Sequence, residues 1–190
     1  SICKDREVIY QGYHGYADYE AGKPNDLETR FLIASVTKQF TAACVMMLVE
    51  EGKINLQHTL DNYLPEYTYA SQITIRQMLN MMSGIPDMIN EVIVEEIEQD
   101  KTERTQEEQL IFEYQTQSRC FPLSEVLELV NNRELNFEPG TSMNYSNTNY
   151  SFLGFIVERL SGQSLGTFME ERIFKPLHMN ETICNPSMAT

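Results

Sequence analysis

Two segments of the chain carry apolar residues at the spacing of an amphipathic helix, and this pattern constrains the fold more than any other feature. The first stripe consists of Val36, Phe40, Ala43, Cys44, Met47 and Leu48 and is followed by Gly52. The second consists of Tyr150, Leu153, Val157 and Leu160 and is followed by Gly162. Spacings of three and four place each set on one helix face, and glycine commonly ends a helix. The pattern predicts helices at residues 35–51 and about 150–160, each burying one face.

Shorter signals surround these two helices. The first thirty-odd residues are rich in Tyr, Val and Ile and are interrupted by turn residues, which predicts a strand hairpin and a loop. The stretch TRFLIA, residues 29–34, predicts a short buried strand or an extended segment. Three further short helices are expected to begin at the cap residues Thr74, Ser124 and Ser164. The residues after Phe174 are expected to form a loop.

The order of elements indicates the fold class. A strand pair is followed by a mainly helical body, as in an α/β protein of the α+β type. We expect residues 1–34 to supply the strands and residues 35–190 to form the helical part. Hydrophobic residues make up 42% of the 190 residues, which is enough for a buried core.

An excess of acidic residues limits the partners of this chain. Asp and Glu outnumber Lys and Arg by 28 to 14, for a net charge of −14. Nucleic acid and anionic membrane surfaces should therefore repel it. The longest apolar run, ACVMMLV, has seven residues, far below the roughly 20 that cross a bilayer. No signal peptide is visible.

The cysteines do not suggest a metal site. Cys3, Cys44, Cys120 and Cys184 are widely scattered, form no CxxC pair and have no nearby histidine. We expect four free or buried thiols. The spacing also leaves open the alternative of a disulfide.

Ser35 and Lys38 stand three residues apart at the start of the first predicted helix. Positions i and i+3 share a helix face, so the Lys38 amine can reach the Ser35 hydroxyl. The positive potential of a helix N-terminus favours an alkoxide and disfavours a protonated lysine, and both effects activate a serine. The alternative is an N-cap serine beside a solvated lysine, because 12 Ser and 6 Lys in 190 residues produce roughly 0.4 such pairs by chance.

Tyr145 and Asn147 lie in the polar loop FEPGTSMNYSNTNY, which opens the second predicted helix. A tyrosine near a lysine can ionise well below its usual pKa of about 10, so Tyr145 is a candidate proton acceptor. The Asn147 amide both donates and accepts, which suits it to hold a lysine amine together with a substrate carbonyl or amide. The alternative is a turn in which Asn147 caps the next helix.

A strongly acidic stretch separates these candidates. Residues 91–113 carry nine acidic side chains against Lys101 and Arg104, with scattered Ile, Val, Leu and Phe. The favoured interpretation is a solvated helical face on an insertion. The alternative is a lid over a substrate site.

Four stretches taken together carry a family resemblance. They are RFLIASVTKQFTA, TIRQMLNMMSGIPD, FEPGTSMNYSNTNYSFLGFIVERLSG and ERIFKPLHMNET. They resemble the serine β-lactamase-like and penicillin-binding superfamily, in its branch of class C β-lactamases, D-alanyl-D-alanine carboxypeptidases and related esterases. The resemblance implies a β-lactamase/transpeptidase-like fold, in which an antiparallel sheet accompanies a mainly helical subdomain. The present chain would cover the first strands and the helical part.

The resemblance also implies roles for the candidate residues. Ser35 would be the acylated nucleophile, Lys38 its proton partner and Tyr145 the general base. Asn147 would position substrate and lysine, and the Ser35 backbone N–H would form half of an oxyanion hole, where one donor is typically worth about 3 kcal/mol. The implied function is a serine hydrolase that acts without a metal or organic cofactor. Its small-molecule or peptide substrates would be β-lactams, D-Ala-D-Ala-type peptides, D-amino-acid amides or small esters.

The chain departs from the family pattern in its middle motif and at its end. Met81 and Met82 occupy the place of a usual His-Thr pair, where we expect a structural role. The Lys-Thr-Gly or His-x-Gly triplet, which supplies the second oxyanion donor in relatives, does not occur. We therefore expect a fragment of a catalytic domain with weakened catalysis. Unpaired strand edges in residues 1–34 should invite association with another chain.

Two other classes of function stay open at this point. A protein of the same fold could bind a penicillin or peptidoglycan without catalysis, as a sensor or scaffold. A purely structural helical domain would require Tyr145 to lie far from Lys38. The resemblance suggests the cell envelope or the exterior of a bacterium, although the sequence itself does not determine the compartment.

Overall fold

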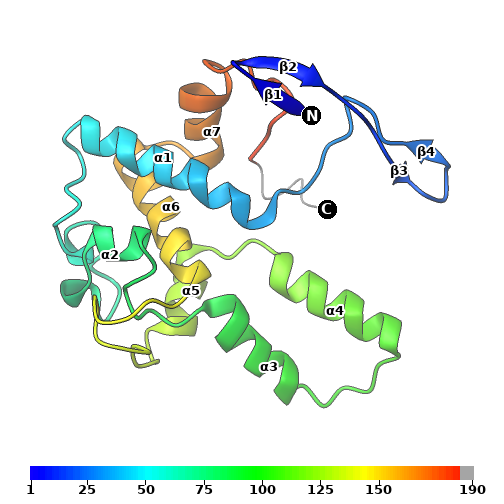
Figure 1. Cartoon of the computed structure of the whole chain (residues 1–190). Coiled ribbons are helices and arrows are strands. Elements are labelled where there is room, and N and C mark those ends of the chain that lie inside the picture. Colours follow the sequence, from blue (N-terminus) through cyan, green and yellow to red (C-terminus); the bar gives the residue numbers. More distant parts are fainter. Residues whose placement is uncertain (185–190) are drawn as a thin grey trace. The chain divides into compact units, whose positions relative to one another are not determined.

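The computed structural model describes residues 1–184, apart from the side chains of residues 117 and 118, and divides at Ala34 into two units (Figure 1). The last six residues of the predicted C-terminal loop lie outside the described residues. The first unit, Ser1–Ile33, contains only strands and loops, and the second unit contains the described helices.

Two small antiparallel hairpins make up the first unit. The strands are β1 (Ile2–Lys4), β2 (Glu7–Tyr10), β3 (Tyr16–Asp18) and β4 (Lys23–Pro24), paired β1 with β2 and β3 with β4. Cys3 lies opposite Val8. The turn residues Asp5 and Arg6 have φ angles of 52° and 68°, a combination typical of a tight two-residue hairpin turn. The predicted hairpin is confirmed.

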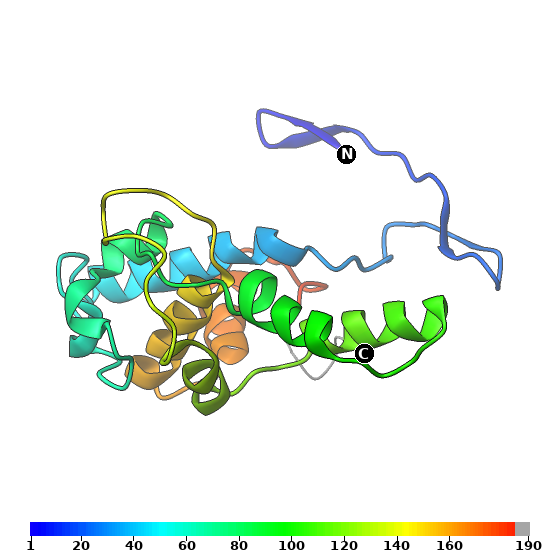
Figure 2. The same ribbon diagram turned by 90° about the horizontal axis from the view of Figure 1, so that it is seen from below.

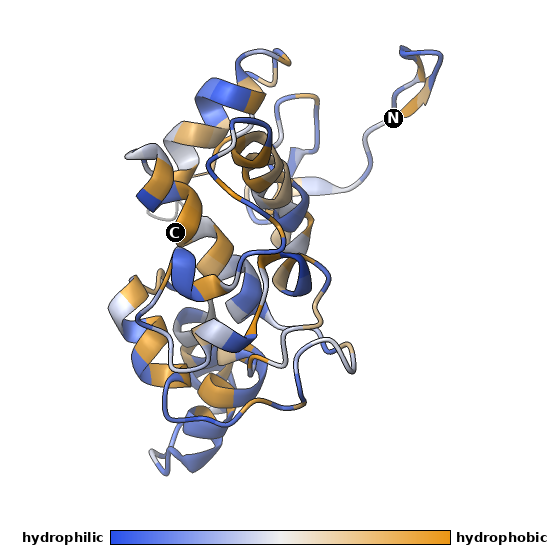
Figure 3. Cartoon of the chain, turned by 90° about the vertical axis from the view of Figure 1, so that its left-hand side faces the viewer, coloured by the Kyte–Doolittle hydropathy of each residue, from blue (hydrophilic) through white to orange (hydrophobic). Residues whose placement is uncertain are grey.

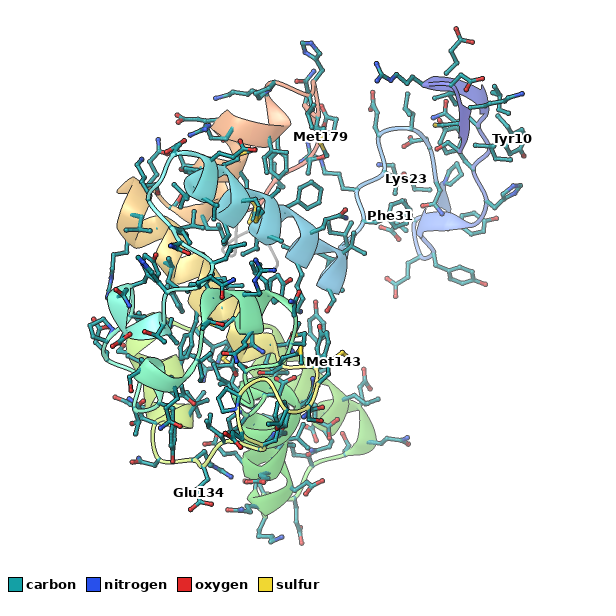
Figure 4. All side chains as sticks on the ribbon, turned by 60° about the vertical axis from the view of Figure 1, so that its left-hand side comes forward. Tyr10, Lys23, Phe31, Glu134, Met143 and Met179 are labelled. Atoms are coloured by element: carbon teal, nitrogen blue, oxygen red, sulfur yellow. The ribbon has the colours of Figure 1, made fainter. Side chains whose placement is uncertain are left out.

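Of the two interpretations of residues 29–34, the buried strand is wrong. Phe31, labelled in Figure 4, and Leu32 belong to no strand and are 69% and 75% exposed. A strand needs a neighbouring strand for its backbone N–H and C=O groups. Within residues 1–184 no strand pairs with this segment, so its β-branched and aromatic composition alone does not make it one.

Helix α6 is the centre of the second unit. It packs against α1, α2, α5, α7 and η4 (Figure 1, Figure 2). These elements are α1 (Thr37–Glu50), α2 (Ile75–Leu79), η4 (Met88–Ile93), α5 (Leu123–Val130), α6 (Asn147–Ser161) and α7 (Leu165–Met169). The core between them includes the side chains of Cys44, Leu48, Met78, Val126, Phe152 and Ile156. Figure 3 shows hydrophobic and hydrophilic residues interspersed along the helices, as expected for helices that bury one face.

Both long predicted helices are confirmed. Gly162 ends α6 in the left-handed conformation with φ 71°, and Gly52 follows α1 with the same φ. The buried face of α1 is turned slightly from the predicted stripe, because Thr41 and Val45 are buried whereas Val36 is 54% exposed.

The shorter helices test the predicted caps. Thr74 forms a capping box with Gln77 at the start of α2, and Ser164 accepts a hydrogen bond from the Thr167 N–H in α7. The predicted cap at Ser124 is wrong, because α5 begins one residue earlier behind Pro122. Proline has no N–H for a helical hydrogen bond, and Pro122 enters the helix with φ −65° and ψ 155°.

The acidic stretch forms helices on the surface. After the π-helical turn η4 come α3 (Val94–Gln99) and α4 (Gln106–Ser118). Glu95 and Glu96 are exposed, and Glu95 pairs with Arg133. The carboxylate of Asp100 lies beside Arg104. Hydrogen bonds, mainly those from Thr102, lower the pKa of Asp100 to about 2. A solvated helical face is thus confirmed, and the lid interpretation stays a prediction.

The remaining elements are short. They are η1 (Ala34–Val36), η2 (Leu60–Asn62), η3 (Ala70–Gln72) and η5 (Glu170–Phe174). In the part of the chain that the structure describes, no helix combines the length and the apolar character needed to span a membrane. The four cysteines are free thiols, as expected. Burial raises the pKa of the Cys44 thiol to about 11.

Candidate active site

Ser35 lies in η1, one turn of 3-10 helix just before α1. Its neighbour Ala34 has φ 43°, a left-handed conformation that residues with a side chain rarely adopt. The predicted helix at 35–51 therefore starts two residues later, at Thr37, and Val36 occupies the N-cap position of α1 without a side-chain cap. The alternative interpretation of Ser35 as an N-cap is wrong. Ser35 is exposed, and Lys38 in the first turn of α1 donates from Nζ to Ser35 Oγ over 3.2 Å.

Tyr145 reaches the same hydroxyl from the loop that precedes α6. Its phenol oxygen lies 2.5 Å from Ser35 Oγ, and the phenol donates to Asn147 Oδ1 over 3.2 Å. Tyr145 is 43% exposed, and Met143 on the same loop, labelled in Figure 4, is 72% exposed. The serine hydroxyl and the phenol are therefore both open to a molecule arriving from solvent.

Asn147 contacts both Lys38 and Tyr145. Its Oδ1 accepts from Lys38 Nζ over 2.7 Å, and the Lys38 Nζ lies 4.7 Å from the centre of the Tyr145 ring. Asn147 is the first residue of α6 and Ser146 holds the N-cap position, so the interpretation of Asn147 as a cap is wrong. All four predicted residues meet in one place. A purely structural helical domain would require Tyr145 to lie far from Lys38, and the short distance between them contradicts that interpretation.

Backbone contacts hold the Tyr145 loop in place. The Asn144 N–H donates to Met81 O over 3.0 Å, and the Gly140 N–H donates to Met82 O over 2.8 Å. Because these contacts use main-chain atoms, they do not depend on the His-Thr pair that the family usually carries there. Ser146 and Thr148 add hydrogen bonds from their hydroxyls to Pro86 O, over 3.3 and 2.7 Å.

Tyr150, one turn into α6, also lies near the lysine. Lys38 Nζ is 5.8 Å from its ring centre, and its hydroxyl donates to Leu79 O over 3.1 Å. Burial, reinforced by Tyr145, raises the pKa of Tyr150. Tyr150 therefore stays protonated, and its ring lines the site.

Asp87 is a residue in contact with the site that reasoning from the sequence missed. Its carboxylate is 1% exposed and accepts from Asn147 Nδ2 over 3.0 and 3.2 Å. The available signal was an acidic residue placed just before a helical turn, where it caps η4 by accepting from the Ile89 and Asn90 N–H groups.

The arrangement can move a proton away from Ser35. The Ser35 oxygen has the phenol oxygen of Tyr145 and the amine of Lys38 as direct neighbours. A proton leaving the serine thus has two neighbouring groups, either of which can accept it when deprotonated, as nucleophile activation requires. In residues 1–184, no group of three His, Cys, Asp or Glu side chains is arranged to hold a metal ion.

Known proteins are similar to this chain over most of its length. Residues 1–189 match the family model "Beta-lactamase". The chain is 30% identical to penicillin-binding protein 4* of Bacillus subtilis (strain 168) over 178 residues, covering 93% of this chain and 35% of the relative. It therefore spans about a third of the length of the curated relatives it matches.

Solved structures show the same similarity. The penicillin-binding protein from Bacillus halodurans superposes with a TM-score of 0.69 at 28% identity, over 88% of this chain and 46% of that one. D-amino acid amidase from Ochrobactrum anthropi SV3, complexed with L-phenylalanine amide, gives 0.66 at 28% identity, over 87% and 41%. Both cover most of this chain and less than half of their own.

Proposed function

Because the chain belongs to the beta-lactamase family, whose members are serine hydrolases, we propose that it transfers an acyl group from an amide or ester carbonyl to Ser35. Its fold is β-lactamase/transpeptidase-like and covers part of the complete domain. The observation that carries the proposal is the contact of Ser35 Oγ with both Tyr145 and Lys38, at 2.5 and 3.2 Å.

The proposed step follows from these neighbours. Ser35 Oγ attacks the carbonyl carbon, and its proton passes to whichever of its two neighbours is deprotonated: a Tyr145 phenolate beside the Lys38 ammonium, or a Lys38 amine beside the Tyr145 phenol. The Ser35 N–H, in η1, would donate to the carbonyl oxygen as negative charge develops there. When the carbon–nitrogen or carbon–oxygen bond breaks, the leaving group takes up that proton. Water then releases the acyl group from the serine.

The substrate class is proposed from the similar proteins. Penicillin-binding proteins and a D-amino acid amidase are among them, which favours β-lactams, D-Ala-D-Ala-type peptides, D-amino-acid amides or small esters. Selectivity among these depends on pocket shape, because a fold hosts many substrates. The negative charge of the chain disfavours polyanionic substrates.

Covalent labelling tests the proposal. The 190-residue chain, incubated with a fluorophosphonate and in parallel with a penicillin, is expected to gain the mass of one adduct per molecule. Peptide mapping is expected to place the adduct on Ser35. A fluorophosphonate is already activated, so it depends less than a natural substrate on a complete oxyanion hole.

Two serine variants make the result specific. Ser35→Ala should abolish the adduct, whereas Ser142→Ala, which removes another exposed serine hydroxyl, should leave it unchanged. A folded wild-type chain that gains no adduct would contradict the proposal and favour a non-catalytic binder. An adduct that persists in Ser35→Ala would also contradict the proposal.

A further inference from the structure

Asp87 accepts hydrogen bonds from Asn147, one of the four site residues, and we infer that it is a positioning residue for Asn147. In this role its carboxylate holds the Asn147 amide with the oxygen turned towards Lys38 and Tyr145. The inference rests on the proposed function, since the amide matters only if those two side chains activate Ser35.

The surroundings of Asp87 match a fixed acceptor. The carboxylate is buried and is satisfied by hydrogen bonds, as a buried charge requires. Oδ1 accepts from the Ile89 and Asn90 N–H groups over 2.9 and 3.2 Å, and Oδ2 accepts from Asn90 Nδ2 over 2.6 Å. Both oxygens also accept from Asn147 Nδ2. The start of η4 therefore immobilises the carboxylate, which in turn holds the amide.

The orientation of the Asn147 amide follows from what lies at its two ends. Its oxygen accepts from Lys38 Nζ over 2.7 Å and from the Tyr145 phenol over 3.2 Å. A flipped amide would point its N–H groups at an ammonium and a phenol O–H, and its oxygen at a carboxylate. Lysine offers only donors and an ionised carboxylate only acceptors, so both ends of the flipped amide would lose their hydrogen bonds. Asp87 therefore selects the orientation that binds Lys38.

Asp87 also caps η4, and this structural role has to be separated from the positioning role. Asp87→Asn does so, because asparagine caps a helix about as well as aspartate. Its side chain keeps one oxygen for the Ile89 and Asn90 N–H groups. Its other terminal atom becomes an NH₂ group, which cannot accept. The variant therefore loses the 3.0 Å hydrogen bond from Asn147 Nδ2 and keeps only the 3.2 Å contact with the remaining oxygen.

A double-mutant cycle on labelling kinetics tests whether Asp87 acts through Asn147. The measured quantity is the rate at which a fluorophosphonate labels Ser35. We expect Asp87→Asn and Asn147→Ala each to lower this rate about tenfold or more. The double variant should be no slower than Asn147→Ala, because residues acting through one contact are not additive. Asp61→Asn, which alters an exposed aspartate, is expected to keep the wild-type rate.

Two kinetic outcomes would overturn the inference. One is a wild-type labelling rate in Asp87→Asn. The other is a rate that Asp87→Asn lowers by the same factor in the Asn147→Ala background as in the wild type, since Asp87 would then act by another route.

A spectroscopic readout decides the inference without any chemistry at Ser35. In an amide ¹H–¹⁵N spectrum, the side-chain signal of Asn147 is identified by its loss in Asn147→Ala. In Asp87→Asn that signal should shift and its hydrogens should exchange faster with solvent. An unmoved signal contradicts the inference. Failure of the proposed function has a different signature, namely absence of Ser35-dependent labelling in the wild-type chain.

Discussion

Replacing Lys38 by methionine is expected to slow fluorophosphonate labelling of Ser35 by about a hundredfold or more. Methionine has a similar length but no amine, so the variant loses the hydrogen bonds to Ser35 Oγ and Asn147 Oδ1. A positioned proton-transfer group typically contributes 10²- to 10⁴-fold to a rate. The loss is expected to be chemical, because Lys38 is only partly buried and its apolar stem is retained.

A second lysine provides the matched control. Lys53, just after α1, has a side chain that is 48% exposed and pairs with Glu51. Lys53→Met removes the same charge away from Ser35 and is expected to change the labelling rate by less than about twofold, since exposed ion pairs contribute little. Equal labelling of wild type and Lys38→Met, with unchanged melting temperatures, would contradict the role of Lys38.

Gly84→Ala is expected to lower the free energy of unfolding by about 3 kcal/mol or more. Gly84 has φ +77°, and a Cβ atom there would lie 2.2 Å from the Phe137 carbonyl oxygen. The same loop is held by the Asn136 N–H, which donates to Gly84 O over 2.8 Å. The expected cost combines a left-handed residue with a side chain, about 1–2 kcal/mol, and overpacking, about 1–3 kcal/mol.

Gly52→Ala is the matched control, because it lacks a contact like the one between Gly84 and the Phe137 carbonyl. Gly52 has φ +71°, and a Cβ there would meet nothing within 4 Å, so Gly52→Ala is expected to cost only about 1–2 kcal/mol. Denaturant unfolding of both variants measures the difference. Equal destabilisation would show that the Phe137 carbonyl moves away without cost and that the loop before Asp87 is softer than its contacts indicate.

Local signals explain which parts of the fold were predictable. Helices α1 and α6 follow from apolar periodicity and from Gly52 and Gly162, which are properties of neighbouring residues. The caps at Thr74 and Ser164 follow from side chains that accept from a backbone N–H three residues away. The strand interpretation of residues 29–34 was wrong because a strand depends on a partner elsewhere in the chain. The predicted cap at Ser124 was wrong because Pro122 sets the start of α5.

The site was less predictable from local signals than the helices were. The Ser35–Lys38 contact follows from an i, i+3 spacing, but Tyr145 lies 110 residues further along the chain. Only the family resemblance linked it to Ser35. Asp87 was missed because its contact with Asn147 joins residues 60 apart and depends on which way an amide faces, which no local pattern records.

A crystal structure of the phosphonylated chain tests the central claim most directly. The account predicts phosphorus bonded to Ser35 Oγ, with Lys38 Nζ and the Tyr145 hydroxyl each within about 3.5 Å of the modified serine or its phosphonate oxygens. Phosphorus on another side chain, or a Tyr145 hydroxyl pointing to solvent far from Lys38, would contradict it.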